Sequence, residues 1–254
     1  MSPEDFRLDG KNALVTGSRK GIGAGIALAL AEAGANVVCH GQNAKPGSIG
    51  AEIRALGRKT LYIAGDIADA AVCANLVQKT VAELGSLDIL VNNAGIIRRA
   101  PAAEYPDEYW NETIAVDLTA VFRLSKLAGQ QMLKQGKSGK IVNVASVLSF
   151  QGGILVPAYA AAKGGVAQLT KALANEWAAK GINVNAIAPG YIVTEVTAAL
   201  RSDPVRNRQI LERIPAGRWG EPADIGGAAV FLSSSVSNYV HGHVLAVDGG
   251  WLSR

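Results

Sequence analysis

Short apolar or β-branched runs alternate with longer stretches of helical period along the chain, and this alternation constrains the fold more than any other feature. The short runs cover residues 13–16, 36–39, 61–65, 88–92, 140–145, 182–188 and 243–247. The helical stretches between them include 22–33, 70–84, 108–133 and 158–179. Alternation of this kind favours right-handed crossovers and a parallel sheet between two layers of helices. The sequence therefore predicts an α/β fold with a doubly wound sheet of seven parallel strands and helices on both faces.

The first predicted strand runs through a glycine-rich turn into a helix, as ALVTGSRKGIG over residues 13–23. Gly17, Gly21 and Gly23 permit a tight turn and let a pyrophosphate approach the helix N-terminus. Free N–H groups and the helix dipole favour anions there. Glycines also occur in turns that bind nothing, but the strand–turn–helix context favours a nucleotide site. The sheet is thus expected to be of the Rossmann type.

The chain has 254 residues, enough for one large α/β domain or two small ones. Neither a linker-like Pro/Ser/Gly tract nor an internal repeat divides it. We therefore expect one dinucleotide-binding and catalytic domain over 1–254, with a small helical substrate lid near 191–218, its helical part at 194–213.

Composition and charge exclude several other classes. The net charge of +4 is spread without a basic run, which disfavours nucleic acid and favours a small anionic ligand. The start, MSPEDFRLDGKN, lacks the apolar part of a signal peptide, and no apolar run reaches the ~18 residues of a membrane span. Cys39 and Cys73 are far apart and without a ligand-spaced histidine, so we expect two buried thiols, no metal site and a cytoplasmic location.

Tyr159 and Lys163 stand four residues apart in YAAAKGG, among alanine and glycine. In a helix they share one face, so a phenol and an ammonium lie side by side. A free phenol titrates near ~10, and lowering its pKa to ~7 needs about 4 kcal/mol of differential interaction. The small neighbours leave room for something large to approach.

These motifs together resemble the short-chain dehydrogenase/reductase family over essentially the whole chain. The match comprises the TGxxxGxG turn, NNAG at 92–95, a serine after the strand KIVNVAS, YxxxK, and PG at 189–190 followed by a threonine. The resemblance implies that Tyr159 is the general acid/base, that Ser146 binds the substrate oxygen, and that Lys163 lowers the pKa of Tyr159 and holds the nicotinamide ribose.

The resemblance also implies the cofactor residues. They are Gly17, Ser18, Arg19, Lys20, Gly21, Ile22, Gly23, Asp66, Ile67, Asn93, Ala94, Gly95, Tyr159, Lys163, Pro189, Ile192 and Thr194. Asp66 and Ile67 would contact adenine, although Asp66 has the alternative of capping the next helix. One position departs from the family pattern. Asp117 stands where an asparagine is usual, and it is retained as a candidate catalytic residue whose charge alters the usual proton relay.

The cofactor is NAD or NADP, with a slight preference for NADP. An acid at the end of the second strand would grip the ribose of NAD, but that position holds Gly41. Arg19 and Lys20 are placed to attract a 2′-phosphate. Against this, they can be solvated loop charges, and related enzymes are mostly NAD-dependent.

Further stretches, among them NNAGIIRR and RIPAGRWGEP, resemble members of the family that interconvert a 3-deoxy-2,5-diketo sugar acid and 2-keto-3-deoxygluconate. Gluconate 5-dehydrogenases, other sugar dehydrogenases and 3-oxoacyl reductases are the alternatives. Arg98, Ser146, Gln151 and Tyr159 are the expected substrate residues. Arg98 is preferred over Arg99 for the carboxylate because it lies closer to the strand end, and Arg218 competes with it.

Two further expectations concern assembly and class. The family resemblance implies a homotetramer paired through the last helix and strand, with a small-residue face at Gly226, Gly227, Ala228 and Ala229 that would permit close approach. The alternative is that this face packs inside one subunit. A non-catalytic redox sensor is the other class of function, which Ser146, Tyr159 and Lys163 together disfavour.

Overall fold

The computed structural model describes residues 2–254 and contains one sheet of seven parallel strands. Their order is β3-β2-β1-β4-β5-β6-β7. The strands are β1 (Asn12–Val15), β2 (Asn36–Gly41), β3 (Thr60–Ala64), β4 (Ile89–Asn92), β5 (Gly139–Val144), β6 (Ile182–Pro189) and β7 (Val244–Val247). The predicted fold class is confirmed. Strands β2 and β3 are added on one side of β1, whereas β4 to β7 are added on the other. The topological switch point therefore lies between β1 and β4, beside the glycine-rich turn.

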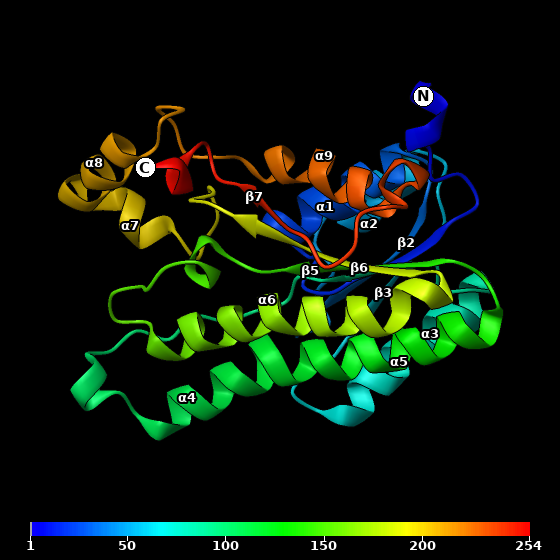
Figure 1. Cartoon of the computed structure of the whole chain (residues 1–254), viewed down its shortest axis with the longest axis horizontal. Coiled ribbons are helices and arrows are strands. Elements are labelled where there is room, and N and C mark those ends of the chain that lie inside the picture. The colour runs from blue at the N-terminus through cyan, green and yellow to red at the C-terminus, as the bar shows by residue number, and fades with distance from the viewer. Residues whose placement is uncertain (1) are drawn as a thin grey trace.

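Helices cover both faces of this sheet (Figure 1). One layer consists of α1 (Gly21–Glu32), α2 (Ile49–Ala55) and α9 (Pro222–Ser233). The other consists of α3 (Ala70–Leu84), α4 (Asp107–Ile114), α5 (Ala120–Gln135) and α6 (Pro157–Trp177). Two short helices, α7 (Ala198–Ser202) and α8 (Pro204–Arg213), lie beyond the carboxyl ends of the strands, where the sequence predicts a helical lid.

Short turns of other helical types complete the chain. The 3-10 turns are Pro3–Phe6, Ala102–Glu104, Val147–Ser149, Ala178–Lys180, Ser235–Ser237 and Trp251–Ser253. A π-helical turn, Ala115–Thr119, joins α4 to α5. The prediction of one regular helix over 108–133 is therefore wrong in this detail. A π turn is defined by its i→i+5 backbone hydrogen bonds, which the side-chain pattern does not report directly.

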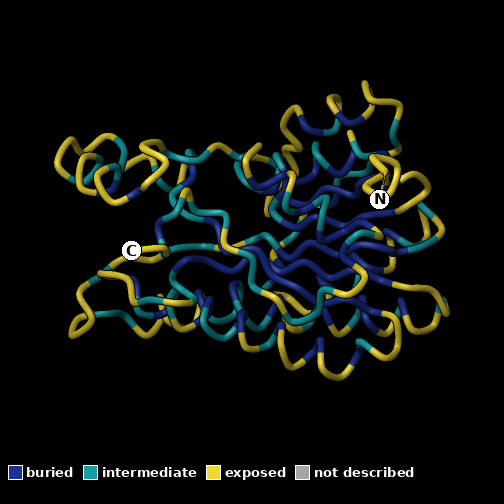
Figure 2. Tube along the Cα trace, turned by 45° about the horizontal axis from the view of Figure 1, so that its top comes forward, coloured by how far each residue is buried: buried dark blue, intermediate teal, exposed yellow. Residues whose placement is uncertain are grey.

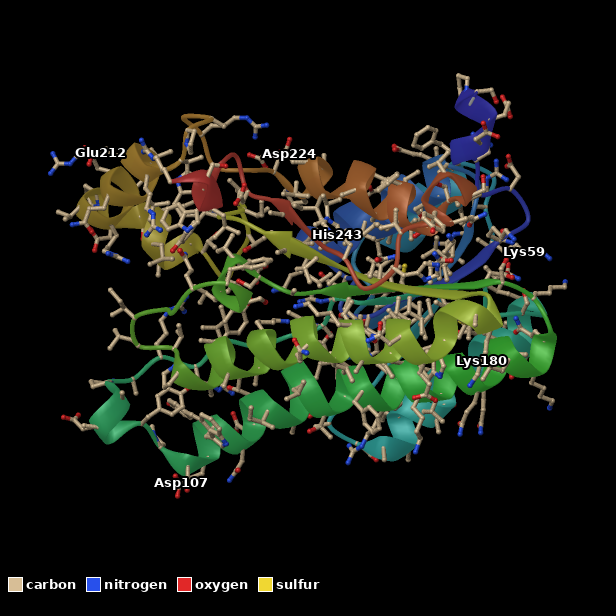
Figure 3. All side chains as sticks on the ribbon, viewed as in Figure 1. Lys59, Asp107, Lys180, Glu212, Asp224 and His243 are labelled. Carbon is tan, nitrogen blue, oxygen red and sulfur yellow. The ribbon has the colours of Figure 1, made fainter. Side chains whose placement is uncertain are left out.

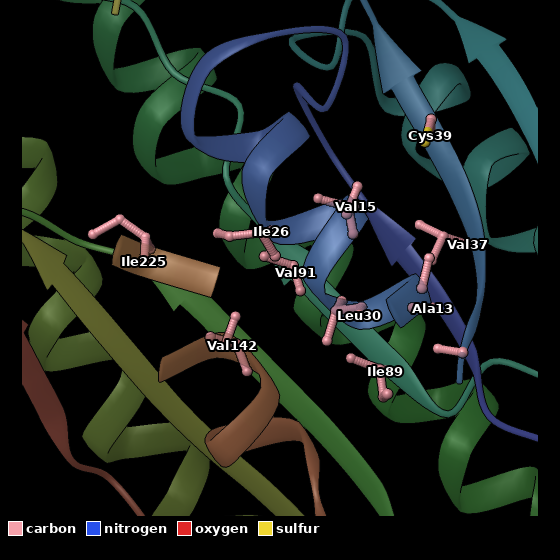
Figure 4. Close-up of a cluster of buried hydrophobic side chains, with 14 of the residues drawn as sticks. Ala13, Val15, Ile26, Leu30, Val37, Cys39, Ile89, Val91, Val142 and Ile225 are labelled. Carbon is pink, nitrogen blue, oxygen red and sulfur yellow. The ribbon is translucent and has the colours of Figure 1, made fainter. Parts of the chain in front are cut away.

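The core consists of two apolar layers, one on each face of the sheet. Ala13 and Val15 of β1 belong to the layer under α1 and α9, whereas Leu14 belongs to the layer under α3 and α5. Successive strand residues point to opposite faces, and strands covered on both sides become continuous apolar runs. Figure 4 shows Ile26 of α1 and Ile225 of α9 in the first layer, and Figure 2 shows the buried strands at the centre.

Helices α1 and α9 pack closely through small residues. A Cβ at Gly226 would lie 2.7 Å from the Cβ of Ala29, and Ala229 is fully buried. Half of the small-residue face that was expected to join subunits thus packs inside the chain. Gly227 remains exposed, and a Cβ there would meet no neighbour within 4 Å.

Cys39 and Cys73 are free and buried, as predicted. Over residues 2–254, none of the helices combines the length and the apolar character that crossing a membrane requires.

Candidate active site

A large cleft lies at the carboxyl ends of the strands and has a volume of about 1210 Å³. Its walls come from the turn after β1, the segments after β2 to β6, the first turns of α6 and the helices α7 and α8. In Figure 3, Glu212 of α8 marks this end of the molecule, and Lys59 and Lys180, which precede β3 and β6, mark the other. Every predicted cofactor, substrate and catalytic residue lines the cleft except Ser18.

Ser18 supports the glycine-rich turn from inside. Its hydroxyl donates to the carbonyl of Val15 at 2.8 Å and accepts the N–H of His40 at 3.0 Å. The side chain is fully buried, so it faces away from the cleft. Its predicted contact with a cofactor does not involve this side chain.

The glycines of the turn are required by conformation and by space. Gly17 and Gly21 have φ of 62° and 58°, which favours glycine. A Cβ at Gly23 would lie 2.4 Å from Nδ2 of Asn93, and this amide donates to the carbonyls of Thr16 and Gly17. Helix α1 has no side-chain N-cap among the described residues, so its first N–H groups are left for another acceptor. These features fit a nucleotide pyrophosphate.

His40 is a site residue that the sequence reasoning missed. Its Nδ1 accepts the N–H of Gly17 at 3.2 Å, and its Nε2 donates to the carbonyl of Gly65 at 2.9 Å. The imidazole is 2% exposed, and this burial lowers its pKa, so the neutral ring links the glycine turn to the end of β3. The sequence feature that pointed to His40 was a single histidine directly after the apolar run of β2.

The two basic residues of the turn differ in their partners. Lys20 forms an ion pair with Glu195, across the cleft from the turn. Arg19 has no hydrogen-bond or ion-pair partner for its guanidinium within residues 2–254. Asp66 accepts the N–H of Ala68, whereas the cap of α3 is Asp69, so the capping alternative for Asp66 does not apply.

Ser146, Tyr159 and Lys163 meet at the floor of the cleft. Ser146 follows β5, and its Oγ accepts the N–H of Leu148 at 3.1 Å, which leaves its own O–H to donate toward the cleft. Tyr159 and Lys163 lie one turn apart on α6, with Nζ of Lys163 5.4 Å from the phenol ring centroid. Nζ also donates to the carbonyl of Val144 at 3.0 Å.

The pKa of Tyr159 is raised above its ordinary value. Burial is the largest cause, and the carboxylate of Asp117 acts in the same direction, whereas the ammonium of Lys163 and the hydroxyl of Ser146 lower the pKa. The ammonium of Lys163 lowers this pKa, as predicted, but the pKa of the phenol still lies above its ordinary value. The cause is the desolvation of the phenol, which the neighbouring cation only partly offsets.

Asp117 lies on the π-helical turn and is completely buried. Its Oδ1 accepts the N–H of Ile96 at 2.8 Å, and its Oδ2 lies 3.4 Å from Nζ of Lys163. Burial raises the pKa of Asp117, and Lys163 opposes this rise. Burial lowers the pKa of Lys163, but the charges of Asp117 and Tyr159 outweigh it and leave this pKa raised.

Among the arginines, Arg98 lines the cleft but is paired with Glu112, which lines it too. Its Nε and Nη2 both lie 2.9 Å from Oε2 of Glu112 on α4, and its guanidinium stands 5.6 Å from the ring centroid of Tyr109. Arg218 forms an ion pair with Asp224 and does not line the cleft. Neither predicted partner for a substrate carboxylate is therefore free to turn inward without losing an ion pair.

Other arginines surround the cleft tyrosines. Burial raises the pKa of Tyr191, and Arg206, Arg213 and Arg99 oppose that rise. The charge of Arg99 also reaches Tyr159. Arg213 donates to Oε1 of Gln151 at 3.0 Å and stacks 4.0 Å from the ring centroid of Trp251. The sequence reasoning placed Gln151 here but missed Arg206, Arg213 and Trp251, which come from distant parts of the chain.

Comparisons with known proteins agree with this geometry. A family model described as enoyl-(acyl carrier protein) reductase matches residues 17–252. A 2-dehydro-3-deoxy-D-gluconate 5-dehydrogenase of Bacillus subtilis (strain 168) is 54% identical over 252 residues, 98% of this chain and 97% of the relative.

Two solved structures are similar over nearly the whole chain. One, from Agrobacterium tumefaciens with bound NADP, is 54% identical with a TM-score of 0.93 and covers 98% of this chain and 99% of its own. The other, a gluconate 5-dehydrogenase from Burkholderia cenocepacia in complex with NADP and tartrate, is 40% identical with a TM-score of 0.94 and covers 99% and 98%.

Proposed function

The chain belongs to the short-chain dehydrogenase/reductase family, and we propose that it acts as a 2-dehydro-3-deoxy-D-gluconate 5-dehydrogenase. The protein is an NAD(P)-dependent oxidoreductase acting on a CH–OH group. The observation that carries the substrate proposal is the convergence of Arg99, Arg206 and Arg213 on the cleft that holds Tyr159. Several guanidinium groups beside a proton-transferring phenol suit a small, polar, anionic ketone.

The residues at the cleft floor would move a proton to or from the substrate oxygen. Bound NAD(P) supplies or accepts the hydride. Tyr159 would donate its phenolic proton to the carbonyl oxygen during reduction and take it back during oxidation. Ser146 would donate a hydrogen bond to the same oxygen and stabilise its developing charge. Lys163 would stabilise the phenolate, because its ammonium is fixed beside the ring by Val144 and Asp117.

The remaining site residues would hold the cofactor by position. Gly17, Arg19, Lys20, Gly21, Ile22 and Gly23 would surround the pyrophosphate and the adenosine ribose. Asp66 and Ile67 would contact adenine, and Asn93, Ala94 and Gly95 the ribose beyond the switch point. Pro189, Ile192 and Thr194 would meet the carboxamide. All of these residues line one cleft, which supports the assignment.

Arg99 is preferred over Arg98 for the substrate carboxylate. Arg98 is held by Glu112, whereas the charge of Arg99 reaches Tyr159 and Tyr191. Arg213 with Gln151 would bind further polar groups of the sugar acid. This revises the sequence-based choice, which rested on closeness to the strand end alone.

NADP is the preferred cofactor of the two. Gly41 provides no carboxylate to repel a 2′-phosphate, and Arg19 lies beside it, since a Cβ at Gly41 would be 3.5 Å from the Cβ of Arg19. Both of the similar structures described above contain NADP. Lys20 is less suited to bind the 2′-phosphate than the sequence predicted, because its charge is neutralised by Glu195.

Gluconate 5-dehydrogenation is the second candidate. The Burkholderia enzyme with that activity is crystallised with tartrate, itself a hydroxy acid. Its identity of 40% is lower than the 54% of the Bacillus relative, which favours the deoxy sugar acid.

A cytoplasmic homotetramer is the proposed state of the enzyme. The edge strand β7 is unpaired on its outer side within residues 2–254, and Gly227 of the neighbouring α9 is exposed. An open sheet edge is commonly covered by another chain. A monomeric mass by light scattering at micromolar concentration would contradict the assembly.

The test is a substrate and cofactor panel with purified protein. We expect kcat/KM to be highest for 2-keto-3-deoxygluconate among sugar acids, with gluconate, neutral sugars and 3-oxoacyl thioesters lower. Tyr159→Phe should reduce kcat by about 10²–10⁴-fold while the Kd of NADPH changes little. Tyr239→Phe, at a fully exposed tyrosine that does not line the cleft, is the control. Full activity in Tyr159→Phe would contradict the catalytic assignment, and inactivity on all sugar acids would contradict the substrate class.

A further inference from the structure

Gly41 is the last residue of β2, and the side chain of Tyr62, in the middle of the neighbouring β3, reaches toward it. A Cβ at Gly41 would lie 2.3 Å from Oη of Tyr62 and 3.3 Å from its Cζ, and the first distance is far below van der Waals contact. The phenol is held in this position by the hydrogen bond that Oη donates to the carbonyl of Asn43 at 2.8 Å, near the surface of the protein. The hydroxyl of Tyr62 thus occupies the space where a side chain of residue 41 would begin.

Position 41 is where cofactor choice is made in this type of fold. A carboxylate at the end of the second strand grips the ribose hydroxyls of NAD and repels the 2′-phosphate of NADP. Any residue that carries such a carboxylate needs a Cβ in the space of the Tyr62 hydroxyl, so the phenol must shift and give up its bond to Asn43. We propose that Tyr62 is a specificity-determining residue, which keeps position 41 as glycine and the 2′ region open to a phosphate. This inference rests on the choice of NADP made above.

Arg19 is packed at the same place. A Cβ added at Gly41 would lie 3.5 Å from the Cβ of Arg19. A Cβ added at Gly47, whose φ is 70°, would lie 3.5 Å from the Cγ of Arg19. The stem of Arg19 therefore passes beside two glycines, whose missing side chains leave it room. Because Glu195 occupies Lys20, Arg19 is the cation of the turn that remains for a 2′-phosphate.

The steric step is tested without any cofactor. Gly41→Ala adds only a Cβ, which should collide with the Tyr62 hydroxyl and lower Tm by about 3–8 °C. In the Tyr62→Phe background the hydroxyl is gone and the ring carbon stands at 3.3 Å, so the same change should cost much less. Gly50→Ala, which meets only the mobile end of Arg54, is the matched glycine control. Equal losses of Tm in both backgrounds would overturn the proposal.

The specificity step is tested by direct binding of NADPH and NADH, followed by nucleotide fluorescence. Gly41→Asp alone should weaken the binding of both nucleotides, because the new side chain displaces Tyr62 and the loop behind it. Gly41→Asp combined with Tyr62→Val should prefer NADH, with a change of about 10²-fold in the ratio of the two Kd values relative to wild type. A single Gly41→Asp that switches preference with an unchanged Tm would overturn the role of Tyr62.

The steric role of Tyr62 and the preference for NADP are tested by separate measurements. Equal affinity of the wild-type protein for NADPH and NADH would overturn the cofactor choice and with it the specificity role. The thermal coupling between residues 41 and 62 does not depend on any nucleotide, so it shows independently whether the steric argument is at fault. Arg19→Ala should raise the Kd of NADPH by about 10-fold or more and leave the Kd of NADH nearly unchanged.

Discussion

The carboxylate of Asp117 lies 3.4 Å from the ammonium of Lys163, and both side chains are buried beneath the reacting end of the cleft. The pair is held from both sides, since Ile96 donates to Asp117 and Lys163 donates to the carbonyl of Val144. A negative charge here works against the deprotonation of Tyr159, while the adjacent cation favours it. The two residues therefore set the proton affinity of the phenol together.

Replacing Asp117 by asparagine should move the pH profile of the reaction. Burial is the largest cause of the raised pKa of Tyr159, but the Asp117 carboxylate adds to it. Removing that charge lowers the pKa of the phenol, so the acid limb of kcat/KM for alcohol oxidation should shift to lower pH. The amide oxygen can still accept from Ile96. The measurement is a pH series from 6 to 10, with Asp69→Asn as a control that keeps the cap of α3.

An acid limb that stays in place in Asp117→Asn would show that the carboxylate is not coupled to the phenol. A limb that moves in Asp69→Asn as well would point to a general effect of net charge instead.

The same pair predicts a stability effect that involves no catalysis. Asp117→Leu leaves the Lys163 ammonium buried without its counter-charge, which should cost about 3–5 kcal/mol in the free energy of unfolding. The double variant with Lys163→Met replaces both charges by apolar groups and should recover most of that loss. Urea unfolding measures both quantities. A double variant that is less stable than the single one would contradict the pairing.

His40 predicts how stability depends on pH. Burial lowers the pKa of this imidazole in the folded protein, and the carbonyl of Gly65 and the charge of Asp66 oppose the shift only in part. The unfolded chain therefore binds the proton more readily, with a pKa near ~6.5. The contribution of His40 to the free energy of unfolding is complete above that pH. It is lost as the pH falls below ~6.5 toward the lower pKa of the folded state.

The measurement is Tm from pH 8 to pH 5 for wild type and for His40→Gln, which can still bond polar groups but does not titrate. We expect the wild type to lose more Tm than the variant below pH ~6.5. Parallel curves would show that His40 is not the group responsible.

Much of the site was predictable because it is encoded locally. The spacing of Tyr159 and Lys163 places them on one face of a helix whatever the helix packs against. The glycine turn is likewise fixed by conformation, since Gly17 and Gly21 have positive φ. The order of the strands then brings Ser146 at the end of β5 beside them.

The rest depended on contacts between segments far apart in the chain. Arg98 and Arg99 are neighbours in an exposed loop, and only the position of Glu112 on α4 distinguishes their roles. The burial of Asp117 against Lys163 depends on a π turn that the apolar pattern does not reveal. His40 acts through the backbone of Gly17 and Gly65, which its strand brings close but which no spacing in the sequence links to it.

Arg99 gives the most direct test of how the substrate is oriented. It lines the same cleft as Tyr159 and Tyr191, and its charge acts on both phenols, so a carboxylate bound to it would lie in the cleft that holds the proton donor. A charge-assisted pair contributes about 1.5–3 kcal/mol, so Arg99→Met should raise KM for the sugar acid by about ten- to a hundredfold. The effect on a neutral sugar and on the Kd of NADPH should be small.

Arg98→Met is the matched control, because it removes the same charge one residue away. That side chain is paired with Glu112 at the surface, and exposed pairs contribute about 0–1 kcal/mol, so we expect KM to change by less than about fivefold. If Arg98→Met raises KM for the sugar acid more than Arg99→Met does, the carboxylate is bound at Arg98 and Glu112 must turn away when substrate enters. If both variants impair acidic and neutral substrates alike, the loop positions the cleft as a whole and neither guanidinium reads the carboxylate.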